Sequence, residues 1–406
     1  MSKLIYLLFL IYPFTILGQT LLVRAGNVLD VKNGIWRKNQ TFLISHGRIV
    51  AWNPSKVAAK TKELDLTNKY LIPGLIDSHT HLLLDDGTLG KNFSEGLLEF
   101  YKKNSIDKRH ELATFRSASL LRSGFTSVRD LGNSGSAIIY KLKNSNLRFF
   151  SSGPGHVPHL GQFPVGTSEK IIKNEYAKMD EAALSKLQKF KRTTLKLYAD
   201  EDPNSTFTDP LILKRWTEKG HGLGLKVATH ATFSPAIQAS IDAGVDSIEH
   251  GTFATSEQFK IMAKKNIFWV PSTGSQILIH KKFEKLRADH ITKEIKILCQ
   301  KIPEAYKSGV KIAFGSDYYL SLEKFDVSFG EATIEALLFL QTCGLPAIEV
   351  IRAATLYPAE LLGLKEIGRL EEGAWADFVV LKDDPLTNLS RLKAPVAVYL
   401  AGSKTE

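Results

Sequence analysis

The sequence contains little cysteine, since only Cys299 and Cys343 occur among its 406 residues. Neither lies near a metal-ligand motif. Both occur in sequence with a helical pattern. We expect two buried free thiols, with a disulfide between them as the alternative.

The chain also lacks an arginine stripe, a basic patch interleaved with aromatic residues, any short-period repeat and any low-complexity segment. It carries 53 Lys+Arg against 42 Asp+Glu, a formal net charge of +11. The basic residues are scattered, as in residues 281–285. This distribution is typical of solvated helix faces, and we therefore expect no nucleic-acid partner.

An apolar run occurs at the N-terminus, where residues 4–17 follow Lys3 and precede Gly18. This order is typical of a secretory signal peptide, and the run is too short for a membrane-spanning helix. We expect residues 1–19 to be removed near Gly18 and the protein to be exported, periplasmic or secreted, without stable membrane insertion. An uncleaved N-terminal anchor is the alternative.

With 44% hydrophobic residues, the rest of the chain can bury a large core. Short strand patterns occupy residues 20–70, and others return near residues 377–381 and 396–400. We therefore expect the two ends, 20–70 and 366–406, to form a small β-sandwich. Between two of the strand patterns, His46 and Gly47 are typical of a tight hairpin turn, which makes His46 a structural residue.

Residues 71–365 alternate between strand and helix patterns, which predicts an α/β fold, specifically a (β/α)8 TIM barrel. The eight candidate strands are Leu71–Ile76, Thr126–Arg129, Leu147–Ser151, Thr194–Leu197, Lys226–Thr229, Ser247–Glu249, Ile267–Pro271 and Lys311–Gly315. Amphipathic helices are expected at Glu111–Ser123, Ser234–Ala243 and Ser256–Lys265. A longer charged helical pattern at 281–305 is expected to fold over the barrel mouth.

Polar side chains follow the ends of five candidate strands. His79 and His81, spaced i, i+2 at the first strand end, should point the same way. The others, at the ends of the fourth, fifth, sixth and eighth strands, are Lys196, His230, His250 and Asp317. Because strand ends converge at the C-terminal mouth of such a barrel, we expect these six residues to form a metal site.

The motifs that carry these residues resemble those of the amidohydrolase superfamily, in particular its binuclear members with a carboxylated lysine. The matching segments are residues 72–81, 126–132, 248–251, 313–317 and 368–377. The resemblance covers nearly everything after the leader. The most similar branch contains imidazolonepropionase-like proteins and dipeptidases that cleave Xaa-Pro or related dipeptides.

The resemblance implies a site for two divalent metal ions, with the more buried ion held by His79, His81 and Asp317, the outer one by His230 and His250, and both bridged by a CO2-derived carbamate on Lys196. Burial and two nearby dications favour the neutral amine that adds CO2. Zinc suits such ligands, with manganese, cobalt or iron as alternatives. A hydroxide bridging the metals would attack the scissile carbonyl, and Asp317 would carry the proton to the leaving nitrogen.

Four further residues are candidates for contacting substrate, namely His156 and His159 in a Gly- and His-rich loop, Tyr198 and Arg129. Tyr198 should share a face with Lys196, and could donate to the substrate carbonyl or pack at the rim. Arg129 could bind a substrate carboxylate bidentately, or form an internal salt bridge with Asp130 or another neighbour.

The predicted function is metal-dependent hydrolysis of a C–N amide bond in a small molecule, with a dipeptide or an N-acyl amino acid as the expected substrate. The alternatives are cyclic-amide hydrolysis, deamination or lactone hydrolysis within the same superfamily, and a non-catalytic binding protein on this fold. Lys196 argues against a mononuclear deaminase, because a single metal needs no bridge. A homo-oligomer is compatible with the sequence.

Overall fold

The computed structural model describes residues 20–84, 99–100, 102–132, 147–153, 155–157, 176–178, 193–200, 208–272, 288–319 and 327–405. The expected leader and His159 lie outside these residues. None of the described helices is long and apolar enough to cross a membrane.

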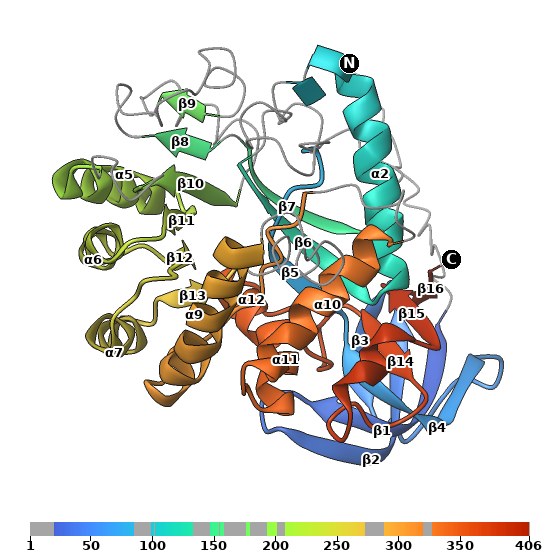
Figure 1. The fold of residues 1–406 in the computed structure, drawn as a ribbon. Helices are drawn as coiled ribbons and strands as arrows, with labels where there is room; N and C mark the ends of the chain where they lie inside the picture. The colour runs from blue at the N-terminus through green and yellow to red at the C-terminus, as the bar shows by residue number, and fades with distance from the viewer. Residues whose placement is uncertain are drawn as a thin grey trace, which may run out of the picture.

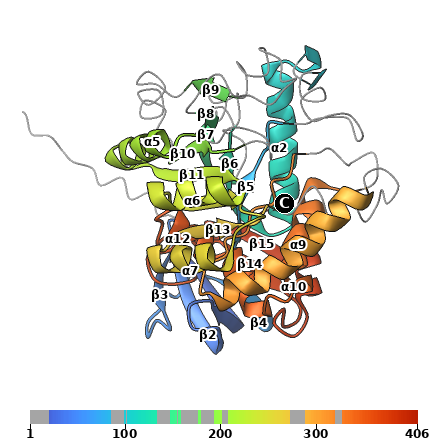
Figure 2. The same cartoon turned by 60° about the vertical axis from the view of Figure 1, so that its left-hand side comes forward.

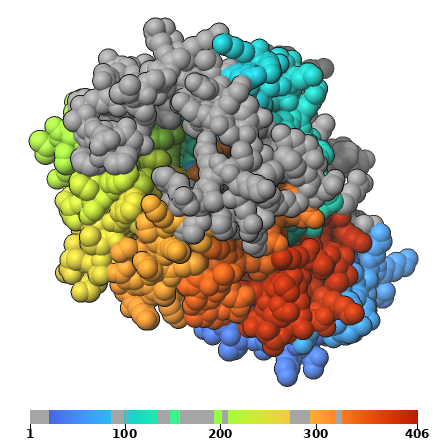
Figure 3. All heavy atoms as spheres, viewed as in Figure 1, coloured from blue at the N-terminus to red at the C-terminus, as the bar shows by residue number. Residues whose placement is uncertain are grey.

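The two ends of the chain build one seven-stranded sheet, as expected for a shared β unit (Figure 1). Its order is β16-β15-β14-β4-β1-β2-β3, and the strands are β1 (Leu21–Asp30), β2 (Ile35–Ser45), β3 (Arg48–Trp52), β4 (Lys62–Pro73), β14 (Phe378–Leu381), β15 (Ala397–Leu400) and β16 (Ser403–Lys404). Buried side chains from both ends, among them Phe42 and Phe378, form its core. Hydrogen bonds join all seven strands into this one sheet. Ile49 N donates to Ala374 O and Ala376 N donates to Gly47 O, so the sheet curls until β3 meets the segment before β14, and the sandwich stays a prediction. In the space-filling view the blue N-terminal strands and the red C-terminal segment lie together at the lower edge (Figure 3).

The turn expected at His46 is present. Strands β2 and β3 pair antiparallel with Ser45 opposite Arg48, which leaves His46 and Gly47 as the turn. Both have positive φ, 50° and 76°, as two-residue hairpin turns of this kind require. His46 is therefore a turn residue.

The boundary between the terminal sheet and the next sheet falls at Gly74, three residues later than the predicted start of the first barrel strand. Strand β4 runs to Pro73 and pairs with β14, and β5 (Leu75–Thr80) begins after Gly74. A Cβ at Gly74 would lie 2.2 Å from Thr126 Oγ1, so only glycine lets the chain pass here. The close approach fixes the point where the chain changes sheets.

Two parallel sheets follow. One has the order β5-β6-β7 and the other β13-β12-β11-β10-β8-β9. Their remaining strands are β6 (Phe125–Leu131), β7 (Arg148–Gly153), β8 (Gly155–Val157), β9 (Tyr176–Lys178), β10 (Thr194–Tyr198), β11 (Lys226–Ala231), β12 (Ser247–His250) and β13 (Phe268–Val270). Seven of the eight predicted strands therefore overlap observed ones.

Helices cover the outside of these sheets (Figures 1 and 2). They are α2 (Ile106–Arg122), α5 (Pro210–Gly222), α6 (Ser234–Ala243), α7 (Ser256–Lys265), α9 (Ala288–Lys307), α10 (Phe329–Thr342), α11 (Ala347–Ala353) and α12 (Leu356–Leu361), with a 3-10 turn, η3 (Leu389–Lys393), near the C-terminus. The predicted helices at 234–243 and 256–265 match α6 and α7, and the third lies largely within α2.

The eighth predicted strand, Lys311–Gly315, is an extended segment with a single bridge, between Trp269 and Ile312. Ala313 N donates to Trp269 O on one side, and Ser78 N donates to Phe314 O on the other, both at 2.9 Å. Phe314 N instead donates to the carbonyl of Ala353, so no regular ladder forms with β5. The segment lies between β13 and β5, and hydrogen bonds between the described strands do not close one cylinder.

The expectation that residues 281–305 fold over the barrel mouth is wrong for residues 288–305, the part that the structure describes. Helix α9 packs between α7 and α10 on the outer wall and does not cover the mouth. Its Leu298, Ile302 and Ala305 are buried in the main core. The helix is charged but has one apolar face, and packing that face against the core removes it from water, which explains this placement.

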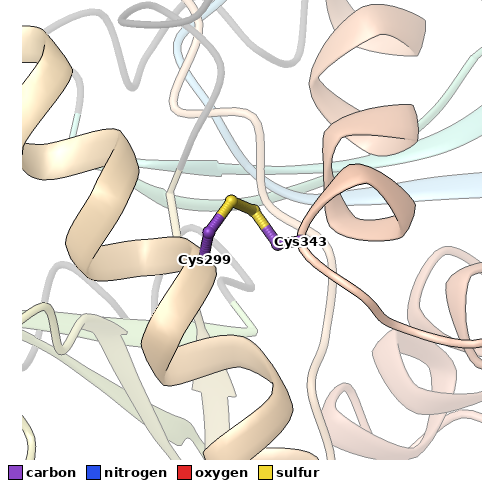
Figure 4. The surroundings of a disulfide bond; sticks show 2 residues. All are labelled: Cys299 and Cys343. Atoms are coloured by element: carbon purple, nitrogen blue, oxygen red, sulfur yellow. A yellow bond between two sulfur atoms is a disulfide. The ribbon is translucent and has the colours of Figure 1, made fainter.

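The expectation of two free thiols is also wrong. Cys299 of α9 and Cys343 at the end of α10 form a disulfide, with their Cα atoms 4.3 Å apart (Figure 4). The packing of the two helices brings these cysteines together across 44 residues of sequence.

Candidate metal centre

The polar strand ends gather between the two parallel sheets. His79 lies on β5, Lys196 on β10, His230 on β11 and His250 on β12. Asp317 follows the extended segment that lies between β13 and β5, and its N–H donates to the carbonyl of His79 at 2.6 Å. The parallel order of the strands therefore brings these side chains to one place.

The tightest group consists of His79, His81 and Asp317, whose ligand atoms all lie within 4.8 Å of one another. Nε2 of His81 is 2.9 Å from Asp317 Oδ1, and Nε2 of His79 is 3.4 Å from the same oxygen. The i, i+2 spacing thus aims both imidazoles at one carboxylate. Two imidazole nitrogens and a carboxylate oxygen are ligands that zinc accepts.

His250 and His230 extend this group. The ring centroid of His250 lies 5.5 Å from that of His79 and 4.3 Å from that of His230. Nδ1 of His250 is 3.9 Å from Asp317 Oδ2. The four histidines therefore form a continuous series of rings, with Asp317 beside three of them.

The backbone is strained at two of these positions. His250 and Asp317 have φ values of 68° and 50°, in the left-handed region that side chains other than glycine rarely adopt. Trp269 Nε1 donates to the carbonyl of His250 at 2.7 Å and holds this turn. Such strain concentrates at functional sites, where the surrounding contacts maintain it.

Lys196 lies on β10, which pairs in parallel with the strand of His230, and it is 1% exposed. Its Nζ has no hydrogen-bond partner among the described residues. Burial lowers the pKa of Lys196 to about 8, against the opposing effect of Glu249 and Asp317. A buried amine without a hydrogen bond is costly, so the site fits a group that would convert it into a ligand.

The imidazoles of His79, His230 and His250 are neutral at neutral pH. Burial lowers the pKa of His79 and His230, and it lowers the pKa of His250 to about 3. Burial alone would raise the pKa of Asp317, but His79, His81 and His250 hold it well below its ordinary value. Neutral imidazoles and an ionised carboxylate are the forms that bind a divalent cation. The donor set therefore fits the expected metal ions.

Arg129 does not reach solvent. It is fully buried, and its guanidinium donates to Glu249 Oε1 at 2.8 Å and to the carbonyl of Ser78 at 2.5 Å. This geometry favours the internal salt bridge over contact with a substrate carboxylate, and the partner is Glu249 instead of Asp130. Arg129 and His79 hold the pKa of Glu249 well below its ordinary value, although burial alone would raise it.

The other described substrate candidates, Tyr198 and His156, differ in their position relative to the site. The ring of Tyr198 lies 5.3 Å from Lys196 Nζ and 5.4 Å from the ring of His230, so Tyr198 does share the face of Lys196. A Cβ at Gly155 would lie 2.2 Å from Tyr198, which shows that the tyrosine packs directly on this backbone. His156 is 2% exposed on β8, opposite Leu197.

Sequence reasoning assigned no role to two charged residues that hold the site together. Glu249 Oε2 lies 2.9 Å from Nδ1 of His79, and its signal was a carboxylate next to the candidate ligand His250 on a buried strand. Arg116 of α2 is fully buried and donates to the carbonyls of residues 81, 82 and 84 and to that of Tyr319. Its signal was a charge on the apolar face of a helix, between Ala113 and Leu120.

An α/β protein whose parallel strand ends gather four imidazoles, a carboxylate and a buried lysine has the features of a metal-dependent hydrolase. A profile of the amidohydrolase family matches residues 70–404. The chain therefore belongs to the amidohydrolase family, and it is a hydrolase of that family.

Individual relatives agree with this assignment. The chain is 26% identical to ochratoxinase of Aspergillus niger over 418 residues, which cover 89% of this chain and 81% of the relative. It is 24% identical to imidazolonepropionase of Thermoplasma volcanium, with 87% and 86% covered. A solved structure of a Xaa-Pro dipeptidase with bound methionine superposes with a TM-score of 0.78 at 23% identity, over 95% of this chain and 100% of the other.

Proposed function

We propose that the protein is an exported hydrolase with two divalent metal ions, which cleaves the C–N amide bond of a dipeptide or an N-acyl amino acid. The observation that carries the proposal is the convergence of His79, His81 and Asp317 beside a buried lysine without a hydrogen bond. The similarity to a Xaa-Pro dipeptidase and to ochratoxinase supports the substrate class.

In this proposal His79, His81 and Asp317 would hold the more buried ion, and His230 and His250 would hold the outer one. Lys196, as a carbamate, would be a ligand of both. Zinc fits these ligands. When bound, such ions polarise a carbonyl and make a water molecule acidic enough to attack at neutral pH.

Asp317 is the residue that would move the proton. Its side chain is 21% exposed, so one oxygen can face a substrate while Oδ1 faces His79 and His81. As an ionised carboxylate it can accept the proton of the attacking water and deliver it to the leaving nitrogen. Tyr198, beside Lys196 and His230, is placed to donate a hydrogen bond to the substrate carbonyl oxygen.

The proposal extends to fold and location. We propose that the two parallel sheets and the segment 311–317 form the (β/α)8 barrel typical of the family. The disulfide between Cys299 and Cys343 supports export, because such bonds persist in oxidising compartments.

Hydrolysis of a cyclic amide is the second candidate, and the similarity to imidazolonepropionase supports it. Both candidates require the same proton transfer by Asp317. They differ in whether the leaving nitrogen stays attached to the product.

The decisive experiment assays the zinc-reconstituted protein on a panel of dipeptides and N-acyl amino acids, with Asp317→Asn as the matched blank. We expect cleavage of a subset and a loss of about 10²–10⁴-fold in the variant, the usual contribution of a general acid–base group. Mass spectrometry of the products identifies the leaving amino acid. A metal-replete protein that cleaves none of the panel would refute the substrate class and direct the search to cyclic amides.

A further inference from the structure

Glu249 and Arg129 form a buried ion pair directly behind the metal ligand His79. Both side chains are completely buried. Burying two charges is expensive, and an apolar pair of similar size is often at least as stable. Stability alone therefore does not explain why the site contains this pair.

The two oxygens of Glu249 face different partners. Oε1 accepts from Arg129 at 2.8 Å and from Ser247 Oγ at 2.5 Å. Oε2 lies 2.9 Å from Nδ1 of His79. Because Oε1 already has two donors, the carboxylate is held with Oε2 directed at the imidazole.

This arrangement selects one form of His79. An ionised carboxylate only accepts hydrogen bonds, so the nitrogen that faces it must carry the proton. With the proton on Nδ1, the lone pair is on Nε2. This nitrogen lies 3.4 Å from Asp317 Oδ1 without a hydrogen bond to it, and the same oxygen is bonded to Nε2 of His81 at 2.9 Å, so Glu249 is the carboxylate that selects the proton position. The hydroxyl of Ser272, 3.2 Å from Nδ1, can donate or accept and does not make this choice.

We infer that Glu249 is a positioning residue that keeps the proton of His79 on Nδ1 and thereby directs Nε2 to the metal, and that Arg129 positions Glu249. The inference rests on the proposed metal centre. Partners of this kind behind ligating histidines change metal affinity by about 10–100-fold.

Glu249→Gln is the sharpest variant, because it keeps the shape of the side chain. The guanidinium of Arg129 can only donate, so the amide oxygen should turn toward Arg129 and the NH2 group toward His79. The imidazole must then accept on Nδ1 and carry its proton on Nε2. The nitrogen that faces Asp317 would lose its lone pair.

The first measurement is the tautomer of His79 in the metal-free protein, by NMR of ¹⁵N-histidine-labelled samples, with His79→Gln used to assign the signal. We expect the Nδ1–H form in the wild type and the Nε2–H form in Glu249→Gln. An Nε2–H form in the wild type would overturn the inference, whether or not any Glu249 variant folds.

The second measurement is the affinity for Zn²⁺ by competition with a chelator. We expect Glu249→Gln to bind zinc about 10–100-fold more weakly. Asp246→Asn is the matched control, because Asp246 also pairs with a histidine, His221 at 2.8 Å, but contacts none of the proposed ligands. Its zinc affinity should equal that of the wild type.

Removing the guanidinium gives a rescue test. In Arg129→Met with Glu249→Gln, the amide oxygen is free to turn toward His79, and zinc affinity should recover in part. A folded Glu249→Gln protein with wild-type tautomer and zinc affinity would refute the positioning role. A wild type that does not bind zinc would instead refute the proposed function, and the tautomer measurement would still test the inference.

Discussion

Lys196 shows how burial changes the chemistry of a single side chain. In water a lysine is charged, but here the strand places the amine inside the protein, with a pKa of about 8 and no hydrogen-bond partner among the described residues. The neutral amine is then accessible near neutral pH, and a neutral amine is what reacts with CO2. A residue that is unfavourable for folding can in this way serve as a ligand.

We expect Lys196→Met to retain the fold and to bind one metal ion fewer per chain, with loss of hydrolysis. The substitution preserves the length of the side chain and removes a buried amine without a hydrogen bond, so the free energy of unfolding should not fall. Metal content by mass spectrometry and urea denaturation measure the two effects. Unchanged metal content in a folded variant would contradict the bridging role.

The direction of a single side chain could be predicted where strand geometry determines it. The i, i+2 spacing of His79 and His81 required a shared direction, and the structure shows both Nε2 atoms at Asp317. Glu249 could not be assigned a role, because its function depends on Arg129, 120 residues earlier on another strand. The salt bridge of Arg129 was foreseen as an alternative, but its partner was not.

At the scale of elements, the outer helices are joined by more than apolar packing. The disulfide between Cys299 and Cys343 links α9 to the end of α10, and Cys343 is 6% exposed. Helix α9 leads directly into the segment that carries Asp317. The bond thus restrains the part of the chain that carries this candidate ligand.

We expect Cys299→Ser with Cys343→Ser to lower the free energy of unfolding by about 2–4 kcal/mol, because the bond closes a loop of 44 residues in the unfolded chain. Urea denaturation with and without dithiothreitol measures the effect. The reductant should lower the wild-type midpoint and leave the double variant unchanged. Equal midpoints for the wild type with and without reductant would contradict this expectation.

The bounds of a helix could be predicted from local sequence where the helix has one apolar face that packs on one sheet. Helices α6 and α7 match their predicted ranges, because both have clear ends, at Gly244 and Asn266, in the left-handed conformation. The segment 311–315 reads as a strand, yet its backbone bonds are divided between β13, Ser78 and Ala353. The local sequence pattern does not show that the hydrogen bonds of this segment go to three different partners.

At the scale of the whole molecule, one ion pair joins the terminal sheet to the parallel sheets. Arg148 of β7 donates to both oxygens of Asp377, at 2.5 and 3.0 Å, just before β14 begins. The guanidinium also lies 4.1 Å from the ring centroid of Trp375. Asp377 is 3% exposed and also accepts from Ala401 N, so it joins three segments.

We expect Asp377→Ala to lower the free energy of unfolding by about 3 kcal/mol, because Arg148 would lose its partner in a nearly buried site. Glu63→Ala is the matched control, since Glu63 also pairs bidentately with an arginine, Arg24, but about half of each side chain is exposed (46% and 51%). Its cost should be about 1 kcal/mol or less. If urea denaturation gave equal losses of unfolding free energy for the two variants, burial would not determine the strength of the ion pair between Arg148 and Asp377.

The sequence by itself determined the class of fold, the positions of the candidate ligands and the joining of the two ends, because each depends on periodicity, strand order or short motifs. Only the tertiary structure decided the rest. It paired Cys299 with Cys343, placed α9 on the outer wall, directed Arg129 to Glu249, and joined strands from both ends into one continuous sheet. These outcomes depend on which distant side chains become neighbours, and burial then determines their charge, their proton positions and their partners.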